Sequence, residues 1–298
     1  MMKKLPGCVS AGLAPIAGLA KLRRSELRQA RLSEPSAPAS GPAVENPLME
    51  EDAYIGKWVR PNSDAPLEMV GRKGSHDLDW IAGYIIQLLD IRPDDTVLDV
   101  CCGNGLITAR IAPKAKAVTG LDYSQVLLKQ AREISAAPNL VYAQADATKI
   151  SEALGGQKFN KILLCSAFQY FDDAAGRKVL SGLREALLPG GTVAICDIPD
   201  KSRRLGHRVR AAARLLLPSK AEGGASSNER FPSIRARLSY LARNVAAVLK
   251  RKKTDDLGWW WARRDFAAAA GSVGFECQLL DQPKNHPLHS YRFDALLT

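Results

Sequence analysis

The sequence predicts an α/β fold with a mostly parallel sheet. Short apolar runs rich in β-branched residues alternate with stretches of helical periodicity, as in parallel strands that are buried on both faces. One run leads through a glycine turn directly into a helix, and acidic residues stand at the ends of three successive runs. With 298 residues, of which 46% are hydrophobic, the chain can hold one large α/β domain with additions.

The first 48 residues differ from the rest. An apolar run at residues 5–20 is too short to span a bilayer, residues 21–32 form a basic patch, and residues 34–47 are rich in proline, alanine and serine. A secretory signal and a later start codon are alternative interpretations. We expect residues 1–48 to be a disordered or poorly ordered N-terminal extension, followed by one domain at 49–298.

The stretch at residues 96–108 organises the rest of the chain. Residues 96–100 predict a buried strand containing Asp99, residues 103–105 (Gly-Asn-Gly) predict a tight turn, and a helix is expected from Leu106. Glycines let a ligand approach the backbone, and free N–H groups at a helix N-terminus attract anions. The Asp99 carboxylate favours a cation. A ligand that carries both a carboxylate and an ammonium group suits this mixture.

The remaining elements follow in alternating order. Strands are expected at 117–122, 140–146, 159–166 and 192–197, a further strand opens at 274–276, and the last spans 291–297. Helices are expected at 77–91, 124–134, 174–188 and 261–273, with Ser124 as an N-cap. The second and third strands end in Asp122 and Asp146. A carboxylate at position 122 can accept hydrogen bonds from both hydroxyls of a ribose. Solvated loop acids are the alternative for each residue alone.

The central stretch resembles motif I of the class I S-adenosylmethionine-dependent methyltransferases, usually written Leu-Asp-x-Gly-x-Gly-x-Gly. Leu98, Asp99, Gly103 and Gly105 match it, and Cys101 replaces the first glycine. The Leu-x-Pro-Gly-Gly turn at 187–191 is also similar to this family, and the resemblance covers residues 75–200 and 259–298, as in type 11/25-like methyltransferase domains. It implies a Rossmann-like seven-stranded sheet, mostly parallel with a C-terminal antiparallel hairpin, and S-adenosylmethionine as the cofactor.

The resemblance also implies roles for individual residues. Asp122 would bind the ribose, Asp146 the adenine amino group, and Ala147 would line the adenine ring. The expected cofactor-binding residues are Asp99, Cys101, Gly103, Asn104, Gly105, Asp122, Tyr123, Asp146, Ala147 and Ser166. A nicotinamide-dependent oxidoreductase is the rival, but Thr108 occupies the last position of its Gly-x-Gly-x-x-Gly/Ala fingerprint.

The expected reaction is methyl transfer to a small-molecule, lipid-linked or glycan acceptor by in-line displacement. A general base is required only for a hydroxyl nucleophile, and the candidates are His207, His286, His289, Tyr170 and Tyr291. No acid or cysteine at ligand spacing joins His286 and His289, so no metal site is expected. A catalytically silent module that binds S-adenosylmethionine or a membrane is the alternative of a different class.

The net charge of +11 is concentrated in one segment. Residues 201–253 contain 15 Lys or Arg and two acids, so this segment alone carries +13 and the remaining residues sum to −2. We expect residues 201–258 to form a basic helical insertion before the last helix. Three interpretations stay open: a lid that packs on the core, a surface that docks on anionic membrane, and a grip on a phosphorylated acceptor or nucleic acid.

Several sequence patterns bear on the class of partner that the protein binds and on its location. Nucleic acid is disfavoured because the basic segment lacks interleaved aromatic residues and the Asn/Asp-Pro-Pro-Tyr signature is missing after the fourth strand. Residues 259–261, three consecutive tryptophans, either wall an acceptor pocket or anchor the insertion to the sheet. The six cysteines show no Cys-x-x-Cys spacing and suggest a reducing compartment, so a cytoplasmic location is expected, with membrane association at the surface left open.

Overall fold

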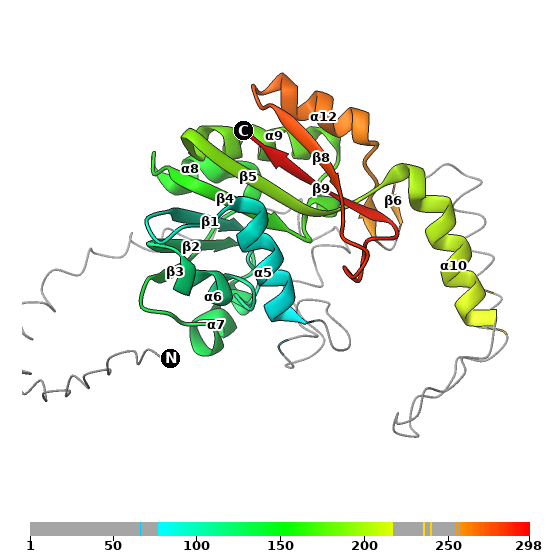
Figure 1. The fold of residues 1–298 in the computed structure, drawn as a ribbon, viewed down its shortest axis with the longest axis horizontal. Coiled ribbons are helices and arrows are strands. Elements are labelled where there is room, and N and C mark those ends of the chain that lie inside the picture. Colours follow the sequence, from blue (N-terminus) through cyan, green and yellow to red (C-terminus); the bar gives the residue numbers. More distant parts are fainter. Residues whose placement is uncertain (1–65, 67–76, 217–234, 236–238, 240–253, 256) are drawn as a thin grey trace, which may run out of the picture. The chain divides into compact units, whose positions relative to one another are not determined.

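The computed structural model describes residues 66, 77–216, 235, 239, 254–255 and 257–298. They form one seven-stranded sheet with helices on both faces, and a separate two-stranded hairpin (Figure 1). The order of strands in the sheet is β3-β2-β1-β4-β5-β9-β8. The expected extension at 1–48 and most of the expected insertion at 201–258 lie outside the described residues. Within the described residues, no helix is long and apolar enough to cross a bilayer.

Five neighbouring strands run parallel, as the apolar runs predict. They are β1 (Thr96–Val100), β2 (Ala117–Asp122), β3 (Leu140–Gln144), β4 (Phe159–Cys165) and β5 (Leu187–Pro199). β3 and β4 end earlier than predicted. Asp146 lies outside β3 because its carboxylate accepts from the N–H of Thr148 and begins the short 3-10 helix η2 (Ala147–Lys149).

The C-terminal strands complete the sheet as an antiparallel hairpin, which confirms the expected fold class. β9 (Arg292–Leu297) lies between β5 and β8 (Cys277–Asp281) and is antiparallel to both. β8 begins after the predicted residues 274–276. Those residues instead close the preceding helix: the N–H of Phe275 donates to Ala270 O, and Gly274 has a φ of +87°.

Two apolar clusters cover the two faces of the sheet. On one face lie α5 (Leu78–Leu89) and α6 (Thr108–Ile111); on the other lie α8 (Ile150–Leu154), α9 (Asp173–Ala186) and α12 (Arg263–Ser272). α7 (Gln125–Ile134) packs beside β2 and β3, and Ser124 caps it as predicted. α6 begins at Thr108 rather than Leu106, because residues 106 and 107 still belong to the turn.

The predicted turn at residues 188–191 is built into β5 as an irregularity. The pairing of β5 with β4 shifts register between Phe159 and Lys161, and Gly190 has a φ of +73°. A side chain at Gly191 would place its Cβ 2.7 Å from Asn160 O, so this position requires glycine.

The described ends of the insertion are tied to the body beside the tip of β5. η4 (Lys201–Arg203) and α10 (Arg204–Leu216) leave the sheet, and an unpredicted hairpin of β6 (Thr254–Asp255) and β7 (Gly258–Trp259) returns. Asp200, which is buried, forms ion pairs with Arg203 and Arg263.

The tryptophans of residues 259–261 anchor this return. Trp261 is buried, packs against Phe168 and Phe266, and pairs with Asp200 in an isolated bridge, so α12 starts at Arg263 instead of residue 261. Trp260 is also buried. Its ring lies 5.8 Å from that of His207 in α10.

Candidate cofactor and acceptor site

Three neighbouring strands end in non-glycine residues with left-handed backbone conformations. The φ angles are +61° at Cys101 after β1, +58° at Ser166 after β4 and +66° at Asp197 in β5. Such residues cost on the order of 1–3 kcal/mol each and cluster at functional sites. β1 is also the strand from which β2 and β4 extend in opposite directions, and ligands of open α/β sheets bind at this kind of switch point. The carboxyl ends of these strands are therefore the candidate site.

The glycine loop after β1 is held in a fixed shape. Gly103 and Gly105 both have positive φ, at +59° and +75°. A Cβ on Gly105 would lie 2.7 Å from Cζ of Tyr142, whose ring fills the space beside the loop. The N–H of Cys102 donates to Leu121 O at 2.9 Å and ties the loop to β2. The absent Cβ of Gly105 therefore makes room for the Tyr142 ring, and the left-handed backbone at both glycines sets the shape of the loop.

Asp99 lies buried beneath this loop. Its Oδ2 accepts a hydrogen bond from the Thr108 hydroxyl at 2.6 Å, so strand and helix are joined through one carboxylate. Burial raises the pKa of Asp99 to about 7; the Thr108 hydrogen bond opposes this rise, and the neighbouring Asp122 charge adds to it. A cation at the loop would favour the charged form.

Asp122 joins the loop to the second strand. Its Oδ2 accepts from the N–H of Gly103 and its Oδ1 from the N–H of Ser124, both at 2.8 Å. Burial raises the pKa of Asp122, and these backbone hydrogen bonds limit the rise. Each carboxylate oxygen keeps a further lone pair. The carboxylate is thus fixed in orientation and can still accept two hydroxyl groups.

The third predicted acid, Asp146, uses one of its two carboxylate oxygens for hydrogen bonds within its own loop. Oδ1 of Asp146 accepts from both the N–H and the hydroxyl of Thr148, at 2.8 Å each, whereas Oδ2 has no hydrogen bond to the described residues. Ala147 follows as a nearly buried residue at the start of η2. Asp122 ends β2, as predicted, whereas Asp146 follows the end of the neighbouring parallel strand β3 by two residues.

Two other predicted cofactor residues have their groups engaged elsewhere. The side-chain amide of Asn104 donates to Pro66 O at 2.7 Å and to Gln130 Oε1 at 2.6 Å, and the side chain is buried. The carbonyl of Tyr123 accepts from Gln144 Nε2. The carbonyl of Asn104 also accepts from the Ser135 hydroxyl at 2.9 Å. The predicted cofactor roles of both residues stay predictions.

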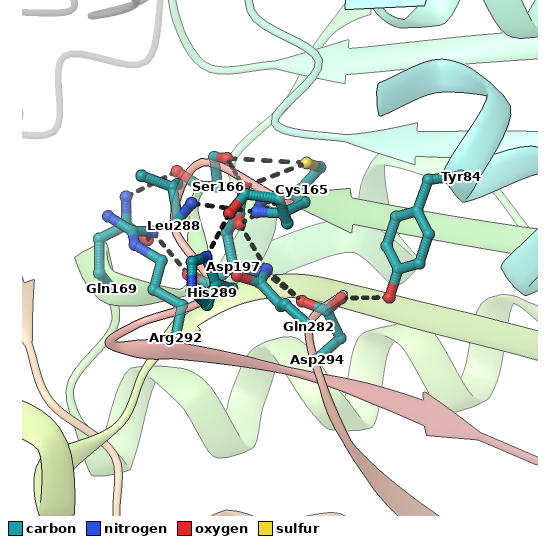
Figure 2. Close-up of polar contacts among 11 residues, drawn as sticks. Tyr84, Cys165, Ser166, Gln169, Asp197, Gln282, Leu288, His289, Arg292 and Asp294 are labelled. Carbon is teal, nitrogen blue, oxygen red and sulfur yellow. Dashed lines mark hydrogen bonds and ion pairs between the residues drawn. The ribbon is translucent and has the colours of Figure 1, made fainter. Parts of the chain in front are cut away.

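A second polar cluster, which the sequence patterns did not predict, lies at the tips of β4, β5 and β9 (Figure 2). Asp197 sits at a register shift between β5 and β9, and its N–H donates to Asp294 Oδ1 at 2.9 Å. The Ser166 hydroxyl donates to Asp197 Oδ2. The Gln282 amide bridges the two acids, with 2.7 Å to Asp197 Oδ1 and 2.8 Å to Asp294 Oδ1. We name Ser166, Asp197, Gln282, Arg292 and Asp294 the tip cluster.

Arg292 completes the tip cluster and sets its charge. Its Nη1 donates to Asp197 O at 2.6 Å and to Gln169 Oε1 at 3.2 Å, and Gln169 in turn donates to Ser166 O. Burial alone would raise the pKa of Asp197, but the charges of Arg292 and His286 and the Ser166 and Gln282 hydrogen bonds bring it below its ordinary value. Asp197 is therefore the anion of the cluster.

The second carboxyl of the tip cluster, that of Asp294, has a raised pKa, whereas the pKa of Asp197 is lowered. Burial and the negative charge of Asp197 raise the pKa of Asp294 to about 6, although Tyr84 donates to its Oδ2 at 2.6 Å. Two buried polar atoms of the cluster, Arg292 Nε and Gln282 Oε1, have no hydrogen-bond partner among the described residues. An unsatisfied donor and acceptor beside a buried anion are the groups that a polar ligand or an ordered water satisfies.

Two of the five general-base candidates lie beside the tip cluster. The Leu288 N–H donates to Nδ1 of His286 at 3.2 Å, so the ring proton of neutral His286 is on Nε2, which lies 3.6 Å from Asp197 Oδ1. Nδ1 of His289 lies 2.7 Å from His286 O and must donate to that carbonyl, which leaves the lone pair of the neutral ring on Nε2. His289 has the geometry of a base, and His286 does not.

The other three candidates lie elsewhere. The rings of His207 and Tyr291 stack at 4.0 Å between α10 and the start of β9. Tyr170 packs against the apolar core at the end of η3 (Phe168–Tyr170). The sequence did carry a signal for the tip cluster: Asp197 ends a predicted strand as Asp122 does, and residues 292 and 294 place charges inside an apolar run.

Comparison with known proteins identifies this arrangement. A family profile described as a methyltransferase domain matches residues 97–191, from β1 into β5. Residues 97–191 therefore form a methyltransferase domain of the class I S-adenosylmethionine-dependent family. S-adenosylmethionine is accordingly the cofactor of the domain, as predicted, and the nicotinamide alternative is wrong. The loop geometry fits this cofactor, since Gly103 and Gly105 adopt left-handed conformations and the Gly103 N–H fixes the Asp122 carboxylate beside the loop.

Curated relatives support the same family. An uncharacterized methyltransferase of Synechocystis is 30% identical over 141 residues, which cover 47% of this chain and 62% of the relative. A ubiquinone biosynthesis O-methyltransferase of Pseudomonas paraeruginosa is 30% identical and covers 53% and 65%. A 23S rRNA uracil methyltransferase of Xanthomonas campestris is 33% identical and covers 37% and 26%. The matches therefore span less than two thirds of these relatives.

A solved structure supports the fold. The S-adenosylmethionine-bound amino pentose methyltransferase CalS10 of Micromonospora echinaspora superposes with a TM-score of 0.51 at 17% identity, covering 76% of this chain and 92% of that protein. CalS10 and this chain thus share the fold, and the names of the relatives include both small-molecule and RNA acceptors.

Proposed function

We propose that the protein transfers a methyl group from S-adenosylmethionine to a small polar acceptor that binds against the tip cluster. The observation that carries the proposal is the adjacency of two polar sites on neighbouring strand ends. The Asp99–Asp122 site lies at β1 and β2, and the tip cluster lies at β4, β5 and β9. A cofactor site and an acceptor site must adjoin for direct transfer.

On the cofactor side, each residue has a distinct task. The glycine loop offers backbone N–H groups to the carboxylate of the ligand, and Asp99 attracts its ammonium group. Asp122 accepts the two ribose hydroxyls. Asp146, through its uncommitted Oδ2, accepts the adenine amino group, with Ala147 against the ring. Cys101 and Ser166 contribute the left-handed turns that shape the crevice.

On the acceptor side, the cluster favours a small polar molecule. It combines one anion with a buried donor and a buried acceptor that lack partners among the described residues, and such groups select ligands by hydrogen bonding. The names of the ubiquinone O-methyltransferase and the amino pentose methyltransferase point the same way, whereas the rRNA relative is covered over only 26% of its length. Lipid-linked and glycan acceptors remain within this class.

The mechanism requires mainly positioning. The sulfonium of S-adenosylmethionine supplies an electrophilic methyl group and leaves as a neutral thioether, so the protein need not protonate the leaving group. Well-oriented reactants gain about 7–11 kcal/mol relative to a bimolecular encounter. If the nucleophile is a hydroxyl, His289 accepts its proton at Nε2, because Nδ1 is fixed on the His286 carbonyl.

Calorimetric binding of S-adenosylmethionine to Asp122→Ala, followed by methyl transfer with labelled cofactor, tests the proposal. We expect the wild-type chain to bind the cofactor and Asp122→Ala to lose at least tenfold in affinity. Asp79→Ala, an exposed acid on α5, is the matched control and keeps wild-type affinity. A screen of small hydroxyl and amine acceptors should then yield labelled product. Unchanged affinity in Asp122→Ala would contradict the ribose role, and label transferred only to RNA would contradict the acceptor class.

A further inference from the structure

The helix α10 carries an apolar pair on its outer surface. Leu205 and Val209, one helical turn apart, are each 59% exposed, and among the large apolar side chains of the described residues only Val141 is more exposed. Residues four apart lie on the same face of a helix. In Figure 1, α10 extends away from the sheet instead of lying along it.

Another face of the same helix holds it to the body. His207 stacks on Tyr291, Arg208 is buried, and the guanidinium of Arg204 lies 5.8 Å from the ring centre of Trp260. At about 100° per residue, the apolar pair is centred roughly 125° around the helix from Arg204, His207 and Arg208, so it is turned away from the attached face. The apolar pair is therefore held in a fixed outward orientation by its own helix.

The segment around this pair is strongly basic. Residues 201–216 contain six Lys or Arg and no acidic residue. Lys201 and Arg210 are exposed, and Arg210 also donates to Ser290 O at 3.2 Å. By contrast, Arg203 is committed to Asp281 and Asp200, so it anchors the segment. Exposed apolar side chains flanked by uncompensated cations are the pattern of a helix that lies at a lipid surface.

We propose that the outer face of α10, with Leu205 and Val209, docks on an anionic lipid surface, flanked by the exposed cations Lys201 of η4 and Arg210 of α10. Charge complementarity selects the partner, since acidic headgroups attract the cations and the acyl boundary accepts the apolar pair. RNA fits less well: aliphatic side chains gain nothing from phosphates, and α10 has no exposed aromatic side chain for base stacking among its described side chains. The docking is independent of the methyl transfer proposed above.

Co-sedimentation of the full chain with vesicles tests this surface. One set of vesicles contains phosphatidylcholine alone, and the other adds phosphatidylglycerol. We expect binding to the anionic vesicles, weakening with added salt, and at least a tenfold loss in the double variant Leu205→Asp/Val209→Asp. The matched control is Val126→Asp/Val141→Asp, which changes two exposed apolar residues on α7 and β3 and keeps wild-type binding.

Three further measurements keep the test decisive. The milder pair Leu205→Ser/Val209→Ser should lose binding in the same direction, and thermal melting should show that both α10 variants fold, because these side chains are exposed. S-adenosylmethionine affinity should be unchanged in all of them, which separates this proposal from the proposed function. The docking proposal is overturned if the wild-type chain does not bind anionic vesicles or if both α10 double variants bind them as well as the wild type does. Binding of RNA that depends on the cations but not on Leu205 and Val209, without vesicle binding, would also overturn it.

Discussion

Ser166 and Asp197 stand level at the ends of two adjacent parallel strands, and the hydroxyl of the first donates to the carboxylate of the second. Both residues adopt left-handed backbone conformations. Both positions therefore carry backbone strain, and their two side chains form a hydrogen bond with each other. In the proposed function, this pair lies on the acceptor side of the site, and Asp99 and Asp122 lie on the cofactor side.

Replacing Asp197 should cost far more stability than replacing Ser166. Asp197→Asn keeps the hydrogen bond from Arg292 to the main-chain O of residue 197 but removes the negative charge that the buried Arg292 guanidinium stabilises, and leaving a buried charge uncompensated typically costs about 3–5 kcal/mol. Ser166→Ala removes one hydrogen bond to an anion and should cost about 1.5–3 kcal/mol. Urea unfolding followed by fluorescence measures both. Equal losses would mean that Arg292 does not depend on the Asp197 charge.

Stability should decrease as the pH rises from about 4 to about 7. Asp99 and Asp294 have native pKa values of about 7 and about 6 against 3.8 for the unfolded chain, so the native state binds more protons in this window. The contribution of these two carboxyls to the free energy of unfolding is complete at pH values below the pKa of the unfolded chain. It is lost as the pH rises through their native pKa values. The size is on the order of a few kcal/mol. Urea unfolding at a series of pH values measures the slope.

The variant Asp99→Asn isolates one of the two groups in that pH profile. It keeps the shape of the side chain but cannot lose a proton, so its stability curve should be flatter up to pH 7 than that of the wild type. Asp94→Asn, an exposed acid in the turn before β1, should leave the slope unchanged. If Asp99→Asn kept the wild-type slope, the pKa of the Asp99 carboxyl would not differ between the native and the unfolded chain.

The cofactor half of the site could be predicted because its signals are local. The strand that contains Asp99, the glycine turn and the strand that ends at Asp122 are each continuous in sequence, and parallel pairing places their ends together. The tip cluster could not be assembled in this way. Asp197 and Asp294 are 97 residues apart, and they meet only because β9 enters the sheet between β5 and β8. No local pattern states which strands become neighbours.

Gly105→Ala should be poorly tolerated, whereas Gly83→Ala should not. A Cβ at Gly105 meets the Tyr142 ring, and its φ of +75° disfavours any L side chain by about 1–2 kcal/mol before the clash is counted. Gly83 lies within α5 with open space around its Cα, so alanine there should stabilise by about 1 kcal/mol. Thermal melting and calorimetric cofactor binding compare the two variants. A wild-type cofactor affinity in Gly105→Ala would argue against close ligand approach at this loop.

His289→Gln should change the pH dependence of methyl transfer to a hydroxyl acceptor. Only a neutral imidazole can accept the proton, so the wild-type rate should fall on the acid side. Glutamine cannot accept the proton, and the variant should lose about 10²–10⁴-fold in kcat together with that acid limb. Single-turnover rates from pH 5 to 9 provide the measurement.

His207→Gln is the matched control for the general base. His207 stacks on Tyr291 between α10 and the start of β9, so its replacement should leave the acid limb and kcat in place. Cofactor affinity should be unchanged in both variants, because the proposed cofactor residues lie at or just after the ends of β1, β2 and β3, whereas His207 lies on α10 and His289 precedes β9. If His289→Gln keeps a wild-type pH profile, the acceptor either carries a nucleophile that needs no base or gives its proton to another group. The Nε2 lone pair of His289 would then have no part in the reaction.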